Sequence, residues 1–306
     1  MLKINSKTQD AILFYVLRTI TVLVILLLIA IMGVLVHSAL PAISKSGMQF
    51  ITHKEWRPME DEFGALPFIY GTLVTSFLAL LIAAPISIFI ALFITEYLPK
   101  RLSKFVALLI EMVAAIPSIV FGLWGIFFLV PLIKENVAPF LINHFGFLPF
   151  FKGPSFGIGV FTASIVLAIM IIPTISSICR SIFELIPGHQ KEASYALGST
   201  KYEMIKISVL SPSISGITSA IVLGLGRALG ETMAVTMLIG NSPVISTSLL
   251  SPGATMASVM ANEYTDANTP LHIASLCYIA LILFMITFLS NLFARRIVHQ
   301  FSRVKK

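Results

Sequence analysis

The sequence of 306 residues is 57% hydrophobic and only 11% charged, with a mean hydropathy of +0.95 and a formal net charge of +7. A soluble domain carries about 25% charged residues, so this composition excludes an ordinary soluble protein and predicts an integral membrane protein. In a membrane protein, the excess of basic residues informs on topology rather than on nucleic-acid binding. The two cysteines, Cys179 and Cys277, are expected to be free thiols. The six histidines are scattered without a His-x-x-x-His pair, so we expect no metal site.

Six apolar segments are long enough to cross a bilayer. They span residues 19–40, 66–94, 105–133, 156–178, 213–240 and 271–294. The first has an uncharged core of about 18 residues, longer than the roughly 7–15 of a secretory signal, so we expect an uncleaved helix. Prolines 85, 117 and 173 lie inside segments, where they are expected to kink or break helices or are simply tolerated.

The predicted organisation is an all-α polytopic membrane protein of three parts. Residues 1–65 hold the first transmembrane helix and an outer loop, residues 66–294 form a core of five transmembrane helices, and residues 295–306 form a basic tail. In the long loop of residues 241–270, we expect a short surface or re-entrant helix near residues 254–260.

Basic residues are distributed unequally between the two faces that six spans define. One face collects Lys3, Lys7, Arg18, Lys100, Arg101, Lys104, Arg180, Lys191, Lys201, Lys206, Arg295, Arg296, Arg303, Lys305 and Lys306. The other face has only Lys45, Lys54, Arg57, Lys134 and Lys152. Because positive charge favours the cytosolic side, both termini and the loop of residues 180–211 are expected to be cytosolic.

This cytosolic loop has the local signals of two short helices joined by a tight turn. Residues 190–197 are expected to form the first helix, with Gly198 as its C-terminal cap. Thr200 and Glu203 have the spacing of a capping box that starts the second helix. The first helix has a small apolar face, formed by Ala193, Ala196 and Leu197. This face suits docking into a groove on another protein, or an ordinary amphipathic linker.

The fifth segment carries two ionisable residues in apolar surroundings, Arg227 and Glu231. Arg227 lies about 15 residues beyond Pro212, which is roughly 22 Å along a helix and near the middle of a bilayer. A charge at that depth costs at least about 2.5–3.5 kcal/mol. Glu231 lies four positions further on and is expected to share a helix face with Arg227, so the two can neutralise each other.

Two interpretations of this pair stay open. In the functional one, Arg227 binds an oxyanion and Glu231 accepts a hydrogen bond or a proton from a protonated anion. In the structural one, the ion pair locks the fifth segment against its neighbours, and Gly226 and Gly230 allow close helix packing. Glu111, in the third segment, is a further buried acid that faces a cytosolic vestibule or extends toward the interface.

Several motifs are missing from the sequence. It has no Gly-x-x-x-x-Gly-Lys-Ser/Thr loop, so we expect no ATPase site in this chain, and neither His-Glu-x-x-His nor Gly-x-Ser-x-Gly, so we expect no catalytic residues. The remaining class is a transport protein. A secondary anion transporter or channel is the rival from physics alone, but it should show a repeat between its halves, and we find none.

The loop sequence Glu192-Ala193-Ser194-x-x-x-Gly198 resembles the "EAA" loop of ABC importer permeases. In that family the loop forms a coupling helix that sits in a cleft of the cytosolic ATPase. The family pattern has a second alanine where this chain has Ser194, and its later proline comes one position before Pro212.

Three stretches resemble, more narrowly, the PstC-type subunit of phosphate-specific ABC importers. They are Gly224–Thr236 with its Arg-Ala-Leu-Gly-Glu core, Glu111–Gly125 and Ser251–Ser258. The resemblance covers roughly residues 60–294 and implies the type I ABC importer permease architecture. It implicates Arg227 and Glu231 in phosphate passage.

The resemblance also implies the partners and the location of the chain. The partners are a PstA-type permease in a heterodimer, two copies of a PstB-type ATPase that uses the ATP, and an external PstS-type phosphate-binding protein, with no nucleic acid. We expect a multi-pass inner-membrane protein without a cofactor of its own, whose loops at Trp56 and residues 242–270 contact the binding protein. A permease for sulfate or molybdate is the nearest alternative.

Overall fold

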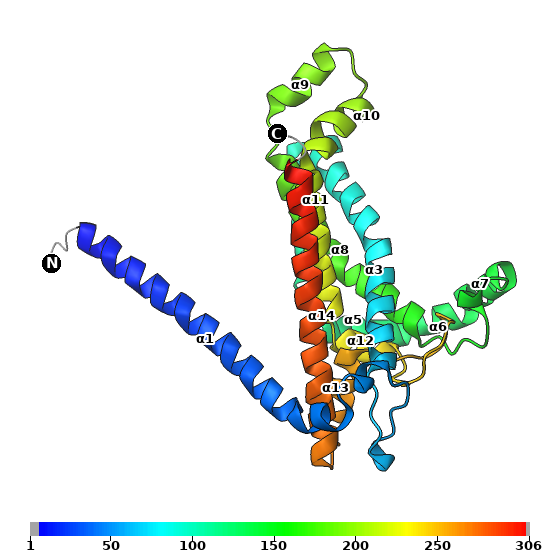
Figure 1. Cartoon of the computed structure of the whole chain (residues 1–306). Coiled ribbons are helices and arrows are strands. Elements are labelled where there is room, and N and C mark those ends of the chain that lie inside the picture. The colour runs from blue at the N-terminus through cyan, green and yellow to red at the C-terminus, as the bar shows by residue number, and fades with distance from the viewer. Residues whose placement is uncertain (1–5, 304–306) are drawn as a thin grey trace.

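The computed structural model describes residues 6–303, and this part of the chain is almost entirely helical. Four long helices form a bundle, in which α3 and α11 both pack against α8 and α14 lies beside α11 (Figure 1). Their bounds are α3 Leu66–Leu92, α8 Val160–Glu184, α11 Ser211–Leu229 and α14 Pro270–Arg303. Within the described residues the only β-type pairing is an isolated bridge between Arg57 and Glu62.

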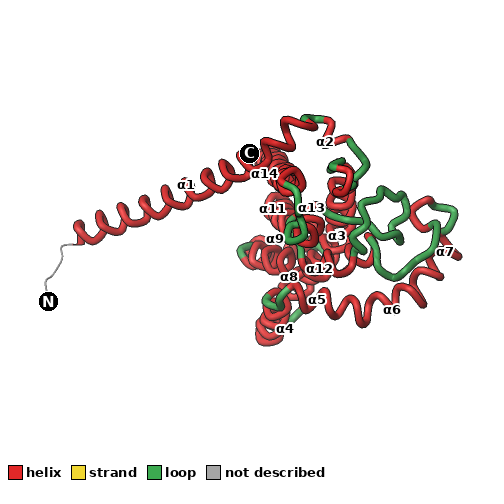
Figure 2. The backbone as a smooth tube through the Cα atoms, turned by 90° about the horizontal axis from the view of Figure 1, so that it is seen from below, coloured by secondary structure: helices red, strands yellow, loops and turns green. Residues whose placement is uncertain are grey.

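Two further helical stretches lean away from this bundle. Helix α1 (Ser6–Ser46) meets α14 near one end and then diverges from the body (Figures 1 and 2). The stretch of residues 118–145 leaves the bundle sideways. It comprises α5 Ser118–Trp124, η3 Gly125–Leu129, α6 Val130–Leu132, η4 Ile133–Val137 and α7 Ala138–Phe145. Both stretches expose apolar side chains that suit lipid or another subunit.

Within the described residues, six helices are long and apolar enough to cross a membrane, as expected, but two of them lie at other residues than predicted. The third candidate span is 118–145 rather than 105–133, because the chain breaks at residues 115–117 and Pro117 caps α5. The preceding residues form a separate amphipathic helix, α4 (Lys100–Ala114), which packs against α8.

The fifth candidate span is also shifted toward the N-terminus. It covers residues 201–229 and ends at Leu229, where the prediction placed it at 213–240. Residues 230–232 interrupt the helix, and a short helix, α12 (Met233–Leu238), follows. In contrast to Pro117, Pro85 and Pro173 lie inside the continuous helices α3 and α8.

The polar loop of residues 180–211 is the predicted helical hairpin. It contains α9 (Gly188–Ala196) and α10 (Lys201–Met204), and a π-helical turn, η6 (Ile205–Leu210), leads from α10 into α11. Thr200 and Glu203 form the predicted capping box, and Gly198 has the positive φ of +82° expected after the helix. Another π-helical turn, η2 (Phe93–Tyr97), ends the span that α3 begins.

The hairpin and the C-terminal end of α14 lie at the same end of the molecule, and α13 (Met256–Glu263) lies at the opposite end (Figure 1). Helix α13 confirms the short helix expected in the long loop, and its first turn is buried. The remaining short elements are α2 Gln49–Thr52, η1 Pro58–Glu60 and η5 Pro149–Phe151.

Two apolar clusters hold the bundle together. One is centred on α8, where Ile171 and Ile175 are fully buried, and the other lies near α13 and includes Phe50, Phe68 and Ile279. Helix α14 continues through Arg303, into the stretch predicted to be a basic tail. Lys3, Lys305 and Lys306, which entered the charge analysis, lie outside the described residues.

Candidate functional site: the Arg227 junction and the α9–α10 hairpin

Arg227 lies in the last turn of α11, where this helix packs against α8. Its side chain is half-buried, and Nη1 donates a hydrogen bond to Oγ1 of Thr174 on α8, at 3.0 Å. The helix ends two residues later, so Arg227 lies at a helix terminus rather than in the middle of a continuous span.

The predicted pairing of Arg227 with Glu231 is wrong in this structure. Within the part of the chain that the structure describes, no carboxylate oxygen lies within 4.0 Å of a side-chain nitrogen of Arg227. The prediction failed because a break follows Leu229, so residues 227 and 231 do not share a helix face. Glu231 instead accepts a hydrogen bond from the backbone N–H of Ala234 at 3.4 Å, at the start of α12. A carboxylate at that position is favoured by the helix dipole.

Within the described residues, the Arg227 guanidinium is therefore a cation whose polar partner is a neutral hydroxyl, that of Thr174. A guanidinium has five N–H donors in a planar fork, and this fork matches the oxygens of a phosphate or another oxyanion. Thr174 holds one edge of it, which fixes its orientation without neutralising its charge. This arrangement can bind an anion without first separating an ion pair.

Glu111 lies outside the third candidate span, in which it was predicted to be a buried acid. It lies on α4, half of its side chain is exposed, and its Oε1 is 2.8 Å from Nη2 of Arg180 on α8. Arg180 also lies 4.0 Å from Glu184. Sequence reasoning missed Arg180 as a partner because α4 and α8 are far apart in the chain. The pair lies toward the hairpin end of α8, about six residues, or roughly 9 Å, beyond Thr174.

Among the described residues, Gly226 and Gly230 have no close helix neighbour of the kind expected from their spacing. A Cβ atom at Gly226 would meet only Asn291 Oδ1 at 3.9 Å, and one at Gly230 would meet only the carbonyl oxygen of Gly226 at 3.8 Å. Gly230 instead follows the end of α11 as its C-cap residue. Close approaches to α8 occur at Gly216 and Gly224, where a Cβ atom would lie 2.6 Å from Cδ1 of Ile182 and of Ile175, respectively.

The hairpin presents its predicted apolar face to the surroundings. Ala193, Ala196 and Leu197 are exposed, and Leu197 retains 90% of its accessible area. Glu192 and Gly198 are exposed as well. An exposed apolar patch of this kind beside a membrane bundle is unfavourable in water and suits a partner protein.

The departures from the "EAA" pattern have structural counterparts. Ser194 Oγ lies 2.5 Å from Ser208 Oγ, and Ser208 Oγ also donates to the carbonyl oxygen of Gln190. These bonds attach α9 to η6, and alanine at position 194 could not make the first of them. The late position of Pro212 fits the π-helical turn before it, because a π-turn closes over one more residue than an α-turn.

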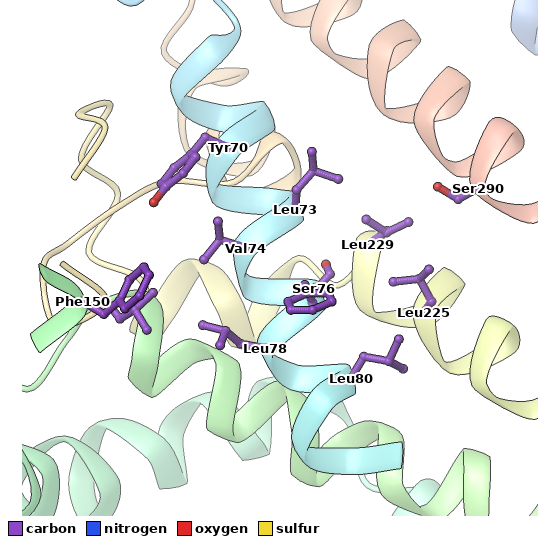
Figure 3. Close-up of a pocket in the computed structure, with 12 residues that line it drawn as sticks. Tyr70, Leu73, Val74, Ser76, Leu78, Leu80, Phe150, Leu225, Leu229 and Ser290 are labelled. Carbon is purple, nitrogen blue, oxygen red and sulfur yellow. The ribbon is translucent and has the colours of Figure 1, made fainter. Parts of the chain in front are cut away.

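A large cavity of about 630 Å³ lies between α3, α11 and α14 (Figure 3). Its lining is mostly apolar, with Leu73 and Leu80 from α3 and Leu225 and Leu229 from α11. Arg227 is not among its lining residues. The cavity therefore lacks the charge that an oxyanion requires, although it lies beside the helix that carries Arg227.

At the α13 end, the loop around Trp56 exposes Lys54, Glu55 and Arg57, whereas the Trp56 side chain itself is buried. Only 6% of it is exposed, and its Nε1–H donates to Oε2 of Glu263 at 2.8 Å. Beside it, a hollow of about 440 Å³ is open to the surroundings. The lining residues are Lys54, Glu55, Trp56, Arg57, Pro243, Val244 and Ile245.

Comparison with known proteins gives the context for this geometry. Residues 83–299 match the family of binding-protein-dependent transport system inner membrane components. A phosphate transport system permease protein PstC of Pasteurella multocida is 48% identical over 274 residues, which cover 88% of this chain and 85% of that protein. A PstC protein of Haemophilus influenzae is 43% identical over 287 residues, covering 92% of this chain and 91% of that protein.

Solved structures show the same fold at low sequence identity. A bacterial ABC transporter involved in the import of alginate has a chain with a TM-score of 0.61 and 19% identity, covering 95% of this chain and 97% of that chain. An inward-facing MetNI methionine ABC transporter gives a TM-score of 0.56 and 17% identity, covering 76% of this chain and 94% of that chain. The architecture is that of type I ABC importer permeases.

Proposed function

Since the chain belongs to the PstC family of phosphate transport system permeases, within the inner membrane components of binding-protein-dependent transport systems, we propose that it passes inorganic phosphate through the membrane as one subunit of an ATP-driven importer. It is a multi-pass inner-membrane protein. The observation that carries the proposal is the half-buried Arg227 guanidinium, which is held by Thr174 and has no carboxylate partner within the described part of the chain.

Arg227 is the proposed contact for the translocated anion. Phosphate is negatively charged and can therefore neutralise this guanidinium. Charge-assisted hydrogen bonds are about twice as strong as neutral ones. Because the Arg227 charge has a neutral hydroxyl partner, it attracts an anion without competition from a carboxylate. Thr174 holds the guanidinium in place and leaves its other donors available.

Glu231 is the proposed contributor to selectivity. Near neutral pH, phosphate is partly protonated and can donate a hydrogen bond to a carboxylate, which sulfate cannot. Glu231 is half-buried, four residues after Arg227 and beyond the helix break. Since it forms no ion pair with Arg227, its carboxylate is available as an acceptor for such an anion.

Glu111 is proposed to act at the end of the pathway nearest the hairpin. It neutralises Arg180, and this pair lies along α8 from the Thr174–Arg227 contact. An anion that leaves Arg227 toward the hairpin end would meet the field of Arg180 next. Glu111 would then keep this second arginine from retaining the anion.

ATP hydrolysis is assigned to a separate subunit, and the exposed hairpin is the proposed contact with it. Ala193, Ala196 and Leu197 would dock into a PstB-type ATPase dimer as a coupling helix. This chain would need no cofactor of its own. Both of its termini and the hairpin would be cytosolic, in agreement with the distribution of basic residues.

Two further partners follow from the proposed function. A PstA-type permease would form a heterodimer with this chain, and Gly226 and Gly230, which meet little within the chain, would allow its close approach. A PstS-type binding protein would deliver phosphate at the α13 end. The hollow between residues 54–57 and 243–245 is the proposed point of contact with it.

The transport cycle then follows from these contacts. The binding protein releases phosphate at the α13 end while ATP closes the partner ATPases. The hairpin carries that closure to the bundle, which opens outward, and phosphate passes Arg227. Hydrolysis returns the bundle to the conformation open toward the cytosol.

The function is tested with the complete importer reconstituted in proteoliposomes. ATP-dependent uptake of labelled phosphate is compared with uptake of sulfate and of molybdate. Sulfate and molybdate are each tested twice, once with their own binding protein and once with the phosphate-binding protein. Uptake of phosphate alone, dependent on both ATP and this chain, is the expected result. Uptake of sulfate or molybdate in place of phosphate would assign the chain to another oxyanion, and uptake without ATP would make it a secondary transporter.

A further inference from the structure

A buried ion pair connects the hairpin to the end of the second span. Glu96 lies in η2, and only 6% of its side chain is exposed. Its Oε1 lies 2.6 Å from Nζ of Lys191 on α9, and the lysine side chain is itself largely buried. The two residues are 95 positions apart in the sequence, so the pair joins two separate elements of the fold.

The next residue of η2 holds the other helix of the hairpin. Nζ of Lys201, at the start of α10, lies 3.8 Å from the ring centroid of Tyr97, which is within the range of a cation–π contact. Consecutive residues of one π-helical turn therefore each hold a lysine, one from α9 and one from α10. π-Helical turns are rare and are often found at functional sites.

The second attachment of α9 is of a different kind. Ser194 and the carbonyl oxygen of Gln190 contact Ser208 in η6, the turn that leads into α11. That attachment is between residues close in sequence and consists of neutral groups. The Glu96–Lys191 pair, in contrast, is charged. It joins α9 to the second candidate span, which is not adjacent to the hairpin in the sequence.

We propose that the Glu96–Lys191 pair is the connection through which movement of α9 reaches α3. The proposal rests on the function proposed above, in which α9 is moved by an ATPase. Removing one partner of a buried pair leaves an uncompensated charge, so α9 and η2 resist separation and move together. Apolar contacts in general can slide, because they have no fixed geometry.

Movement of α3 reaches the anion site through direct packing. Leu80 of α3 and Ile175 of α8 both meet Gly224 of α11, at 4.0 Å and 2.6 Å from a Cβ atom built on that glycine. Ile175 follows Thr174 in the sequence, and Gly224 lies one turn before Arg227. A shift of α3 therefore acts on the two helices whose contact orients the Arg227 guanidinium. Glu96 and Lys191 are positioning residues in this scheme and touch no phosphate.

The test uses the complete importer in proteoliposomes with Glu96→Gln, Lys191→Met and the exchanged pair Glu96→Lys with Lys191→Glu. Lys100→Met, which removes an exposed lysine next to η2, is the matched control. Three quantities are measured: the amount of ATPase that copurifies, the rate of ATP hydrolysis, and the phosphate taken up per ATP.

Each single variant is expected to keep its ATPase partner and hydrolyse ATP within about twofold of wild type. Phosphate taken up per ATP is expected to fall about tenfold, and the exchanged pair is expected to restore most of it. Unchanged uptake per ATP in both single variants would overturn the proposal. Loss of the ATPase partner would also overturn it, because the pair would then serve assembly. Failure of the exchanged pair to restore uptake per ATP would overturn the assignment to the ion pair.

A distance measurement separates this proposal from the proposed function, because it needs no transported substrate. Spin labels are placed at His189 on α9 and Phe89 on α3, after replacement of the two native cysteines by alanine. When Glu96 and Lys191 are both present, the distance between the labels is expected to stay constant on addition of ATP and vanadate. In the Glu96→Gln variant, this distance is expected to change. A constant distance in the variant would overturn the connection. Absence of phosphate uptake in wild type would overturn only the proposed function.

Discussion

At the scale of single residues, the position of Arg227 differs from the one that its sequence context suggests. The spacing of Arg227 and Glu231 describes an ion pair only if the helix continues, and it ends between them. The consequence is chemical, because a neutral hydroxyl replaces a carboxylate as the partner of the arginine. A signal for the break was present in the sequence: a glycine followed by an acidic residue and threonine is typical of a helix end followed by a new helix start.

Glu231→Gln is expected to leave assembly intact and to reduce the preference for phosphate over sulfate about tenfold. The reason is that an amide does not reproduce the charge-assisted hydrogen bond between a carboxylate and a protonated phosphate, and a hydrogen bond to a charged group is worth about 1.5–3 kcal/mol. Competition of sulfate against labelled phosphate uptake measures the preference, with Glu135→Gln, an exposed acid, as the control. Wild-type discrimination in Glu231→Gln would remove Glu231 from the selectivity mechanism.

Other residues of the candidate site could not be identified from the sequence. Glu96 and Arg180 are paired with residues 95 and 69 positions away, and no local periodicity indicates such partners. The exposed face of α9 was predictable because it depends on helical spacing alone. Thus local signals identified the hairpin, whereas the ion pairs that attach it depend on the tertiary fold.

At the scale of elements, the number of spans was predictable and two of their boundaries were not. Hydropathy remains high across residues 105–133, so composition does not reveal the break before Pro117. The proline was the available signal, but Pro85 and Pro173 lie within continuous helices. The same residue type is thus tolerated or disruptive according to the packing around it. The capping box of α10 followed directly from its four-residue pattern.

Gly71 and Gly226 are expected to respond in opposite ways to alanine. A Cβ atom at Gly71 would lie 2.0 Å from the carbonyl oxygen of Ala254, so Gly71→Ala must push α3 away from the segment before α13. The expected cost is about 1–3 kcal/mol. A Cβ atom at Gly226 would meet Asn291 Oδ1 at 3.9 Å, an ordinary contact, so Gly226→Ala should be neutral or stabilise the helix. Thermal unfolding of the isolated chain in detergent compares the two, and equal melting temperatures would show that α3 approaches α13 less closely.

At the scale of the whole molecule, the ends of the bundle differ in composition and exposure. The hairpin end carries the exposed apolar face of α9, and the α13 end carries a packed aromatic cluster in which Trp56 contacts Phe63 and Phe68. The hairpin end is thus suited to binding a partner that moves, and the α13 end is held rigid by aromatic packing. The asymmetry of basic residues predicted which of them is cytosolic, and this assignment requires a topology measurement.

Cysteine labelling tests the topology. In a background with Cys179 and Cys277 replaced by alanine, Tyr202→Cys and Tyr264→Cys place exposed thiols on the hairpin and beyond α13, respectively. With the outer membrane opened, a maleimide that does not cross the inner membrane should label position 264, and position 202 only after the inner membrane is permeabilised. The reverse pattern would invert the proposed topology.

The central claim is that Arg227 contacts phosphate during its passage. The most direct measurement is ATP-dependent phosphate uptake by the reconstituted importer carrying Arg227→Gln or Arg227→Lys, with copurification of the partner permease and ATPase followed in parallel. Arg227→Gln should reduce uptake at least about a hundredfold with assembly intact, because a desolvated charge contact is lost, and Arg227→Lys should retain part of it because the charge remains. Wild-type uptake by Arg227→Gln would contradict the claim, and loss of assembly in both variants would assign Arg227 to the structure of the bundle instead.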